Sequence, residues 1–192
     1  MEKSCYLVKQ CYLIMKKYKV IFADLDGTLI DTISGETFPK GIWDMKIKFD
    51  VLDKIKELEP KFLFIVSNQG GIEKGFVNEY HFYSKLHFIT HSIEEYCGIA
   101  VDCYYCSSND KDDENRKPNC GMLEKAISDY NLISYSHNYC ITIYKKSEML
   151  MIGDASGKEG QFSDCDKKTA ENFGIDYMDV NDFVNTFYYE RD

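Results

Sequence analysis

The segment from Val20 to Thr28 constrains the fold of this chain more than any other. It runs from an apolar stretch over 20–23 into the sequence Asp-Leu-Asp-Gly at 24–27. Alternation along an extended segment puts Asp24 and Asp26 on the same side, and Gly27 lets the chain swing away from them. We therefore expect two carboxylates at the open C-terminal edge of a strand, which suits phosphate chemistry with magnesium. An ordinary acidic turn or a fragment of a calcium loop could carry the same four residues, so the remaining chain decides between them.

Apolar runs and helical stripes alternate along the rest of the chain. Helices are predicted over 50–59, 80–96, 121–130, 166–173 and 180–187, and further strands over 61–67, 99–106 and 149–153, with a short edge strand before residue 180. Alternation of this kind favours right-handed crossovers and a mostly parallel sheet. The predicted fold is an α/β Rossmann-like parallel sheet with helices on both faces. Function is expected at the carboxyl edge of the strands, where Asp24, Ser67 and Asp154 each lie at a predicted strand end.

The length of 192 residues fits one domain with a single core. We expect this domain over 15–192, preceded by an N-terminal extension over 1–14. The segment 131–146 is interpreted as a polar insertion, with a hint of a hairpin in the Ile-Thr-Ile sequence at 141–143.

Targeting signals and charge limit the compartment and the partners. The sequence has no run of roughly 20 uninterrupted apolar residues, and its first residues lack the layout of a signal peptide. We expect an intracellular protein, in the cytoplasm or the nucleus, that is a monomer without a membrane partner. Its eight cysteines are then expected to be reduced thiols. The net charge of −9 argues against broad electrostatic attraction to nucleic acid, although carboxylates that bind a metal add to this charge and still favour phosphate.

Three acidic residues fit the steps of phosphoester hydrolysis. Asp24 fits a nucleophile that forms an aspartyl-phosphate. Asp26 can protonate the departing oxygen and later activate water, which typically contributes about 100- to 10,000-fold in rate. Hard oxygen ligands suit Mg²⁺, and Asp24, Asp154 and the backbone carbonyl of Asp26 supply them.

The phosphate group itself needs donors and a positive charge. Ser67 and backbone N–H groups near Asn68 can hold its oxygens, and Lys117 can offset the charge of the transferring group. Leu25 and Asp26 complete the predicted phosphate-binding set. A lysine in a loop such as Asn-Arg-Lys-Pro at 115–118 would ordinarily be exposed. Lys117 is assigned to the phosphate site only because the other predicted site residues occur in the same sequence.

Four short motifs resemble those of the haloacid dehalogenase phosphohydrolase superfamily. They are DLDGT at 24–28, SNQ at 67–69, RKP at 116–118 and GD at 153–154. The resemblance covers nearly all of residues 18–187 and implies a haloacid dehalogenase-like fold with magnesium-dependent phosphatase activity. The segment between Thr28 and Asp50 leaves room only for a minimal cap, so the end of a polymer could reach the site.

Two further segments are similar to the 3′-phosphatase domain of polynucleotide kinase. TISGETFP at 32–39 with Trp43-Asp44 resembles a T-x-SG-x-x-FP…DW segment, and residues 162–174 resemble an FS-x-x-D…A-x-N-x-G stretch. The resemblance implies removal of a 3′-phosphate from DNA or RNA ends in repair or end-healing. It also implies that Asp166, rather than Asp164, is a supporting acid near Lys117 and the metal.

The chain departs from that family in several places. Ser67 stands where the family often has threonine, and the loop before Lys117 is acidic over 110–114, which puts tight DNA binding in doubt. No G-x-x-x-x-G-K-[ST] phosphate loop is present, so a separate 5′-kinase or a ligase is the expected partner.

Two alternative functions stay open. A small-molecule phosphatase of the histidinol-phosphate or heptose-bisphosphate type would use the same chemistry and is favoured by the acidic charge. A non-catalytic module that binds nucleic-acid ends would not need the nucleophile. Phosphatases of the first type carry a zinc loop, but Cys103, Cys106 and Cys120 lack a fourth ligand, so we expect buried thiols without zinc.

Overall fold

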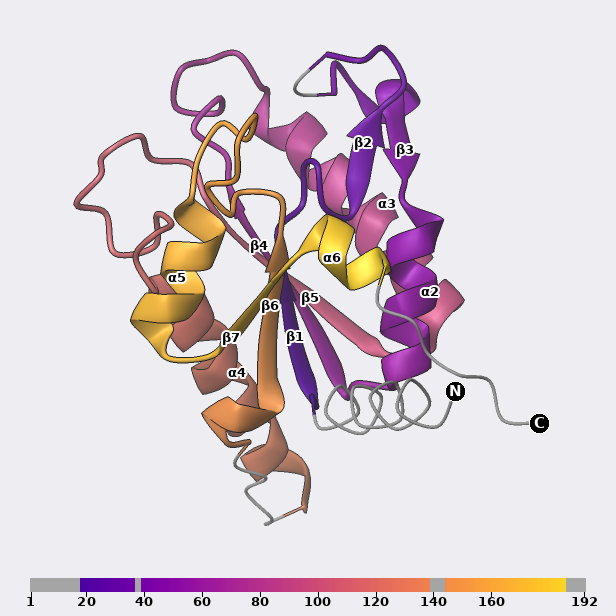
Figure 1. Ribbon diagram of the computed structural model, residues 1–192, viewed down its shortest axis with the longest axis vertical. Coiled ribbons are helices and arrows are strands. Elements are labelled where there is room, and N and C mark those ends of the chain that lie inside the picture. The colour runs from indigo at the N-terminus through magenta and orange to yellow at the C-terminus, as the bar shows by residue number, and fades with distance from the viewer. Residues whose placement is uncertain (1–17, 37–38, 139–143, 186–192) are drawn as a thin grey trace, which may run out of the picture.

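The computed structural model describes residues 18–36, 39–138 and 144–185 (Figure 1). The N-terminal extension predicted over 1–14, the hairpin suggested at 141–143 and two residues of the TISGETFP segment lie outside these ranges. Within them, no helix is long and apolar enough to cross a membrane.

A five-stranded parallel sheet forms the centre of the domain, in the order β5-β4-β1-β6-β7. The strands are β1 (Val20–Ala23), β4 (Phe62–Asn68), β5 (Ala100–Cys106), β6 (Met149–Gly153) and β7 (Asp176–Asp179). Every residue of β1 and β6 is buried, which explains why both segments are continuous apolar runs in the sequence. The predicted parallel α/β sheet is confirmed.

Helices cover both faces of the sheet, and alternate side chains of each strand serve the two faces (Figure 1). Ile21 and Ile65 belong to one core, under α2 (Phe49–Leu58), α3 (Glu79–Cys97) and α6 (Val180–Val184). Phe22 and Phe64 belong to the other core, under α4 (Gly121–Asn138) and α5 (Cys165–Phe173).

A small antiparallel hairpin takes the place of a cap domain. Its strands are β2 (Ile30–Thr32) and β3 (Met45–Ile47), and the 3-10 helix η1 (Ile42–Asp44) precedes β3. The buried carboxylate of Asp44 accepts hydrogen bonds from the backbone N–H of Lys40 at 3.1 Å and from the N–H and hydroxyl of Ser34 at 2.7 and 2.8 Å. The aspartate that follows Trp43 therefore holds the connection between β2 and β3 together.

The predicted end of one helix was wrong. Helix α4 does not stop at residue 130 but continues to Asn138, so the first half of the supposed polar insertion, 131–138, is helical. The reason is that the sequence from 122 to 138 contains neither glycine nor proline to end a helix. A 3-10 turn, η2 (Lys146–Glu148), then leads into β6.

Candidate active site

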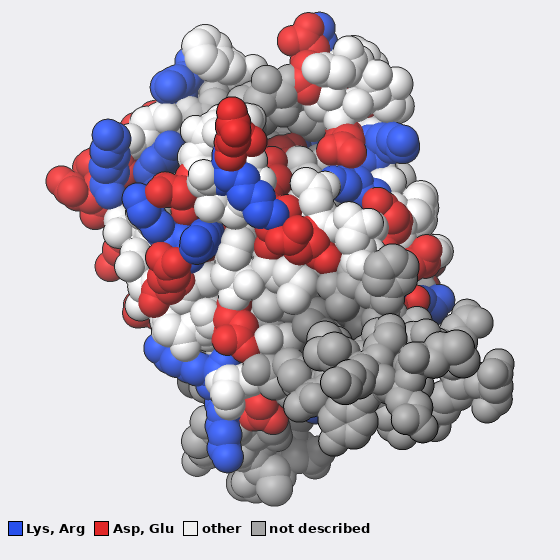
Figure 2. Space-filling view, viewed as in Figure 1, with Lys and Arg blue, Asp and Glu red and all other residues white. Residues whose placement is uncertain are grey.

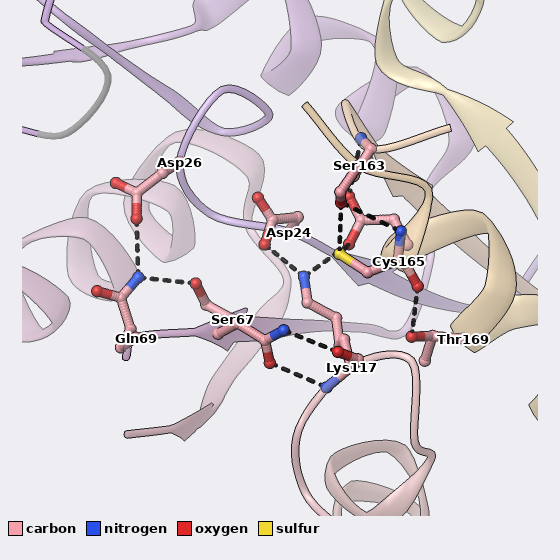
Figure 3. Close-up of polar contacts among 12 residues, drawn as sticks. Asp24, Asp26, Ser67, Gln69, Lys117, Ser163, Cys165 and Thr169 are labelled. Carbon is pink, nitrogen blue, oxygen red and sulfur yellow. Dashed lines mark hydrogen bonds and ion pairs between the residues drawn. The ribbon is translucent and has the colours of Figure 1, made fainter. Parts of the chain in front are cut away.

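Side chains from four parts of the chain meet at the carboxyl edge of the sheet (Figure 3). Asp24 follows β1 and its N–H still pairs with Ile152 of β6 at 3.1 Å. Ser67 lies at the end of β4, Asp154 follows β6, and Lys117 comes from the loop before α4. In the close-up, Asp24 lies between Asp26 on one side and Lys117 on the other.

Lys117 is buried between two carboxylates. Its ammonium lies 2.5 Å from Oδ1 of Asp24 and 2.7 Å from Oδ1 of Asp166, and only 4% of Lys117 is exposed. Burial alone would lower the pKa of Lys117, but the charges of Asp166 and Asp24 outweigh it and raise the pKa. Lys117 is therefore a fixed positive charge beside Asp24, and its contact with phosphate stays a prediction.

The side-chain amide of Asn68 holds the Lys117 loop in place. Its Oδ1 accepts from the N–H of Lys117 at 2.9 Å, and its Nδ2 donates to the carbonyl of Lys117 at 3.0 Å. The side chain of Asn68 thus anchors the loop of Lys117 to the end of β4, and a contact of Asn68 with phosphate would fall to its backbone.

Three carboxylates form a cluster that could hold a metal ion. One oxygen from each of Asp24, Asp154 and Asp166 lies within 4.8 Å of the others. Burial raises the pKa of Asp24 to about 8 and, with the charge of Asp166, that of Asp154 to about 6. A single lysine cannot neutralise three acids, and oxygen donors of this kind fit a hard divalent cation. Asp166, which the sequence assigns only a supporting role, is itself part of the cluster.

Asp164 lies apart from this cluster. Its side chain is 46% exposed and pairs with Lys168 at 2.7 Å, one turn along α5. Asp166 is fully buried, and its Oδ2 also accepts from the N–H of Ala155 at 3.1 Å. The structure thus brings Asp166, and not Asp164, to Lys117.

Asp26 has two partners that the sequence did not reveal. Gln69 donates from Nε2 to Oδ2 of Asp26 at 2.7 Å and to Oγ of Ser67 at 2.8 Å, and Lys85 on α3 lies 3.2 Å from Oδ1 of Asp26. Because Ser67 accepts from Gln69, its own O–H is left to donate. Lys85 lies within the apolar stripe of α3, one residue before Leu86. A lysine at such a position is the only sign in the sequence that its side chain is buried and meets another charged group.

A pocket of about 370 Å³ opens beside Asp26, under the β2–β3 hairpin. It is lined by Asp26, Gly27, Ile30, Asp31, Thr32, Gly35, Glu36, Pro39 and Lys46. The hairpin therefore borders the site without closing it.

The three cysteines weighed as zinc ligands serve different parts of the structure. Cys106 donates its thiol to the carbonyl of Ser108, and Cys120 donates to that of Thr169. Burial raises the pKa of Cys103 to about 12. Within the described ranges these thiols do not form a metal-binding group.

Gly27 allows Asp154 to approach the first loop, and this gives a testable prediction. A Cβ on Gly27 would lie 2.2 Å from Oδ2 of Asp154, and its φ of +84° disfavours any other residue. We expect Gly27→Ala to displace a carboxylate of the cluster and to weaken Mg²⁺ binding at least about tenfold, or 1.4 kcal/mol, by isothermal titration calorimetry.

Gly160→Ala is the matched control for Gly27→Ala. Gly160 has a φ of +88° with nothing within 4 Å, so it shares the backbone strain without the clash. Equal losses of metal affinity in the two variants would contradict the account of Gly27.

The family model described as "Polynucleotide kinase 3 phosphatase" matches residues 19–184. The bifunctional polynucleotide phosphatase/kinase of Schizosaccharomyces pombe is 33% identical over 184 residues, which cover 94% of this chain and 40% of that protein. The chain thus spans less than half the length of this relative.

Sugar-phosphate phosphatases are also similar. The D-glycero-beta-D-manno-heptose-1,7-bisphosphate 7-phosphatase of Haemophilus ducreyi is 31% identical over 150 residues, which cover 72% of this chain and 79% of that protein. The crystal structure of D,D-heptose 1,7-bisphosphate phosphatase from B. bronchiseptica, complexed with magnesium and phosphate, has a TM-score of 0.60 at 18% identity and covers 83% of this chain and 78% of its own. This structural likeness supports the fold.

Proposed function

The chain belongs to the polynucleotide kinase 3 phosphatase family, and from this premise we propose that it removes a phosphate from the 3′ end of a polynucleotide, leaving a 3′-hydroxyl. It is a phosphomonoesterase of the haloacid dehalogenase type. The observation that carries the proposal is the buried contact of Asp24 with Lys117, beside Asp154 and Asp166. A module that only binds ends would not need a buried carboxylate aligned with a lysine in this way.

The reaction proceeds by two displacements. The carboxylate of Asp24 attacks phosphorus through Oδ2, since its Oδ1 is engaged by Lys117. The ester P–O bond breaks, and Asp26 gives its proton to the departing 3′ oxygen. Water, deprotonated by Asp26, then attacks phosphorus and releases inorganic phosphate and Asp24.

The phosphate is held by donors on both sides of Asp24. Ser67 donates its O–H, Lys117 stabilises the negative charge, and the backbone N–H groups of Leu25, Asp26 and Asn68 complete the set.

Asp24, Asp154 and Asp166, with the carbonyl of Asp26, are the residues that would hold Mg²⁺. The ion, when bound, supplies positive charge that stabilises the transferring phosphoryl group. The excess of carboxylates over lysine in the cluster is what supports this assignment.

The surface is consistent with recognition of an end rather than of a long duplex. On the described part of the face seen in Figure 2, acidic and basic side chains are interspersed, and the described residues there form no continuous basic stripe. Affinity then has to come from the terminal phosphate and the adjoining nucleotide. We place the reaction in repair or end-healing of polynucleotide ends within the cell.

The thermal stability of the metal-free protein should fall with rising pH between about 6 and about 8. Burial raises the pKa of Asp24 to about 8 and of Asp154 to about 6, so the folded state binds more protons than the unfolded state in this range. The free energy of unfolding then decreases by up to about 1.4 kcal/mol per pH unit for each proton lost. Calorimetric scans in EDTA measure this slope.

Excess Mg²⁺ should flatten the same slope, because it neutralises the cluster in place of protons. At 100 times its Kd, the ion should add about 2.7 kcal/mol to the free energy of unfolding. If the free energy of unfolding of the metal-free protein rose with pH across this range, the raised pKa values assigned to Asp24 and Asp154 would be contradicted.

The heptose-bisphosphate phosphatase of H. ducreyi supports a second candidate, hydrolysis of a small sugar phosphate. A panel of substrates separates the two functions: a 3′-phosphorylated oligonucleotide, its 5′-phosphorylated isomer, heptose 1,7-bisphosphate and histidinol phosphate, each with Mg²⁺ and with EDTA. We expect kcat/KM for the 3′-phosphate to exceed the others at least about 100-fold, and no turnover in EDTA. Preference for either small molecule would overturn the polynucleotide assignment.

A further inference from the structure

Asp26 is held from two sides, by one residue of the β4 loop and one of α3. Gln69 donates to its Oδ2 at 2.7 Å, and the ammonium of Lys85 lies 3.2 Å from its Oδ1. Gln69 and Lys85 are 8% and 7% exposed. Figure 3 shows Gln69 directed at Asp26 and Ser67 together.

Packing on α3 does not explain a lysine at position 85. The neighbouring positions Phe82, Leu86 and Ile89 are buried apolar side chains, and the Lys85 ammonium lies 5.4 Å from the centre of the Phe82 ring. Burying an ammonium is unfavourable unless a charge opposes it, so an apolar side chain would stabilise this helix face more easily. What lysine adds here is the contact with Asp26.

We propose that Lys85 is a positioning residue that fixes the carboxyl group of Asp26 for proton transfer to the leaving oxygen. The proposal rests on the function assigned above to Asp26. A carboxylate offers about four lone-pair sites, and the contacts with Gln69 and Lys85 use one on each oxygen. The rotamer is thereby fixed while a site on each oxygen is left for the proton.

Lys85 also stabilises the product of that proton transfer. As Asp24 bonds to phosphorus and the ester P–O bond breaks, the proton of Asp26 passes to the departing oxygen, and Asp26 becomes a carboxylate. The nearby ammonium opposes this new charge and keeps it from repelling the phosphoryl group. Lys85 contacts the side-chain carboxyl of Asp26, whereas the backbone carbonyl of Asp26 and the acidic cluster would hold the metal. Loss of Lys85 should therefore impair proton transfer and leave metal binding in place.

Esters with different leaving groups test this proposal. Departure of 4-nitrophenol needs little protonation, whereas departure of phenol needs an acid. We expect Lys85→Met to lower kcat/KM about 100-fold for phenyl phosphate, the lower end of what a positioned acid contributes, but no more than about fivefold for 4-nitrophenyl phosphate. The quantity kcat/KM is compared because it covers only the steps up to departure of the leaving group, and the later hydrolysis is common to both esters.

Further variants keep the test decisive. Lys85→Gln, which retains a donor but no charge, is measured in the same way and serves where Lys85→Met does not fold. In an Asp26→Asn background, Lys85→Met should not change the ratio of the two esters any further. Lys125→Met on α4, where the lysine is 61% exposed, is the matched control and should leave both rates unchanged.

Equal losses for the two esters, or a loss of Mg²⁺ affinity that matches the loss of rate, would overturn the proposal and leave Lys85 a structural residue. The comparison uses no polynucleotide. An enzyme that prefers heptose bisphosphate would therefore refute the proposed substrate while the role of Lys85 is still tested.

Discussion

The Asp24→Asn variant should lose phosphatase activity by about four orders of magnitude or more, because an amide cannot form the phosphorylated intermediate. Its fold should persist. Asparagine has the same shape, and it can still accept the hydrogen bond of Lys117, which keeps its second partner Asp166 at 2.7 Å. Release of inorganic phosphate from a 3′-phosphorylated oligonucleotide measures the loss, and a thermal scan measures the fold.

Stability gives this variant a second signature. Burial raises the pKa of Asp24 to about 8, so the ionised carboxylate is unfavourable in the metal-free protein. Removing its charge should therefore leave the unfolding temperature at pH 8 in EDTA unchanged or higher. Asp164→Asn is the control, since the Asp164 side chain is 46% exposed and pairs only with Lys168 among the ion pairs of the described residues. If Asp24→Asn kept measurable turnover, Asp24 would not be the nucleophile.

Lys117→Met should damage both activity and stability. The variant removes the positive charge next to the transferring phosphoryl group, for which we expect a loss of about 1,000-fold in kcat. It also leaves Asp24 and Asp166 buried without a cation, and breaking a buried pair in this way typically costs about 3–5 kcal/mol. Urea unfolding at pH 8 in EDTA measures that cost.

An exposed lysine shows how much of this effect comes from burial. Lys158 lies 2.8 Å from Asp182 and 3.3 Å from Asp179, and its side chain is 49% exposed. Lys158→Met should cost much less stability than Lys117→Met, because water screens such pairs. If Lys117→Met and Lys158→Met lost the same free energy of unfolding, burial of Lys117 would not be the reason for its large contribution to stability.

Lowering the pH should partly restore the stability of Lys117→Met. The unpaired carboxyls of the cluster can then take up protons, and the raised pKa of Asp24 shows that burial already favours the protonated form. The catalytic loss should not be restored, since a protonated Asp24 is not a nucleophile.

Strand ends were the most predictable part of the site. The apolar runs before Asp24 and Asp154 identified β1 and β6, and parallel strands place their carboxyl ends at one edge whatever the sequence between them. Lys117 was harder, because its loop has no period of its own. The position of Lys117 depends on the two hydrogen bonds from the side-chain amide of Asn68, which lies 49 positions before it in the sequence.

Periodicity shows that Lys85 falls within an apolar stripe, but it does not identify Asp26 as the partner of Lys85 or Gln69. Lys85 lies on a helix whose stripe is apolar, and a lysine at such a position is ordinarily assigned to the solvent face. Only the tertiary structure shows that α3 delivers it to Asp26. The predicted end of α4 at residue 130 comes too early, because it follows from the polar composition of the next residues. The absence of glycine and proline from that segment is the better guide to the helix end.

Phosphorylation of Asp24 tests the central claim most directly. Wild-type protein is mixed with a 3′-phosphorylated oligonucleotide and Mg²⁺, quenched in acid during the first turnovers, digested and analysed by mass spectrometry. We predict one phosphoryl group on the peptide from the end of β1, located at Asp24, sensitive to hydroxylamine and missing from Asp24→Asn. Release of phosphate in a first-turnover burst with Asp24 unmodified, or a phosphoryl group on another residue, would contradict the account.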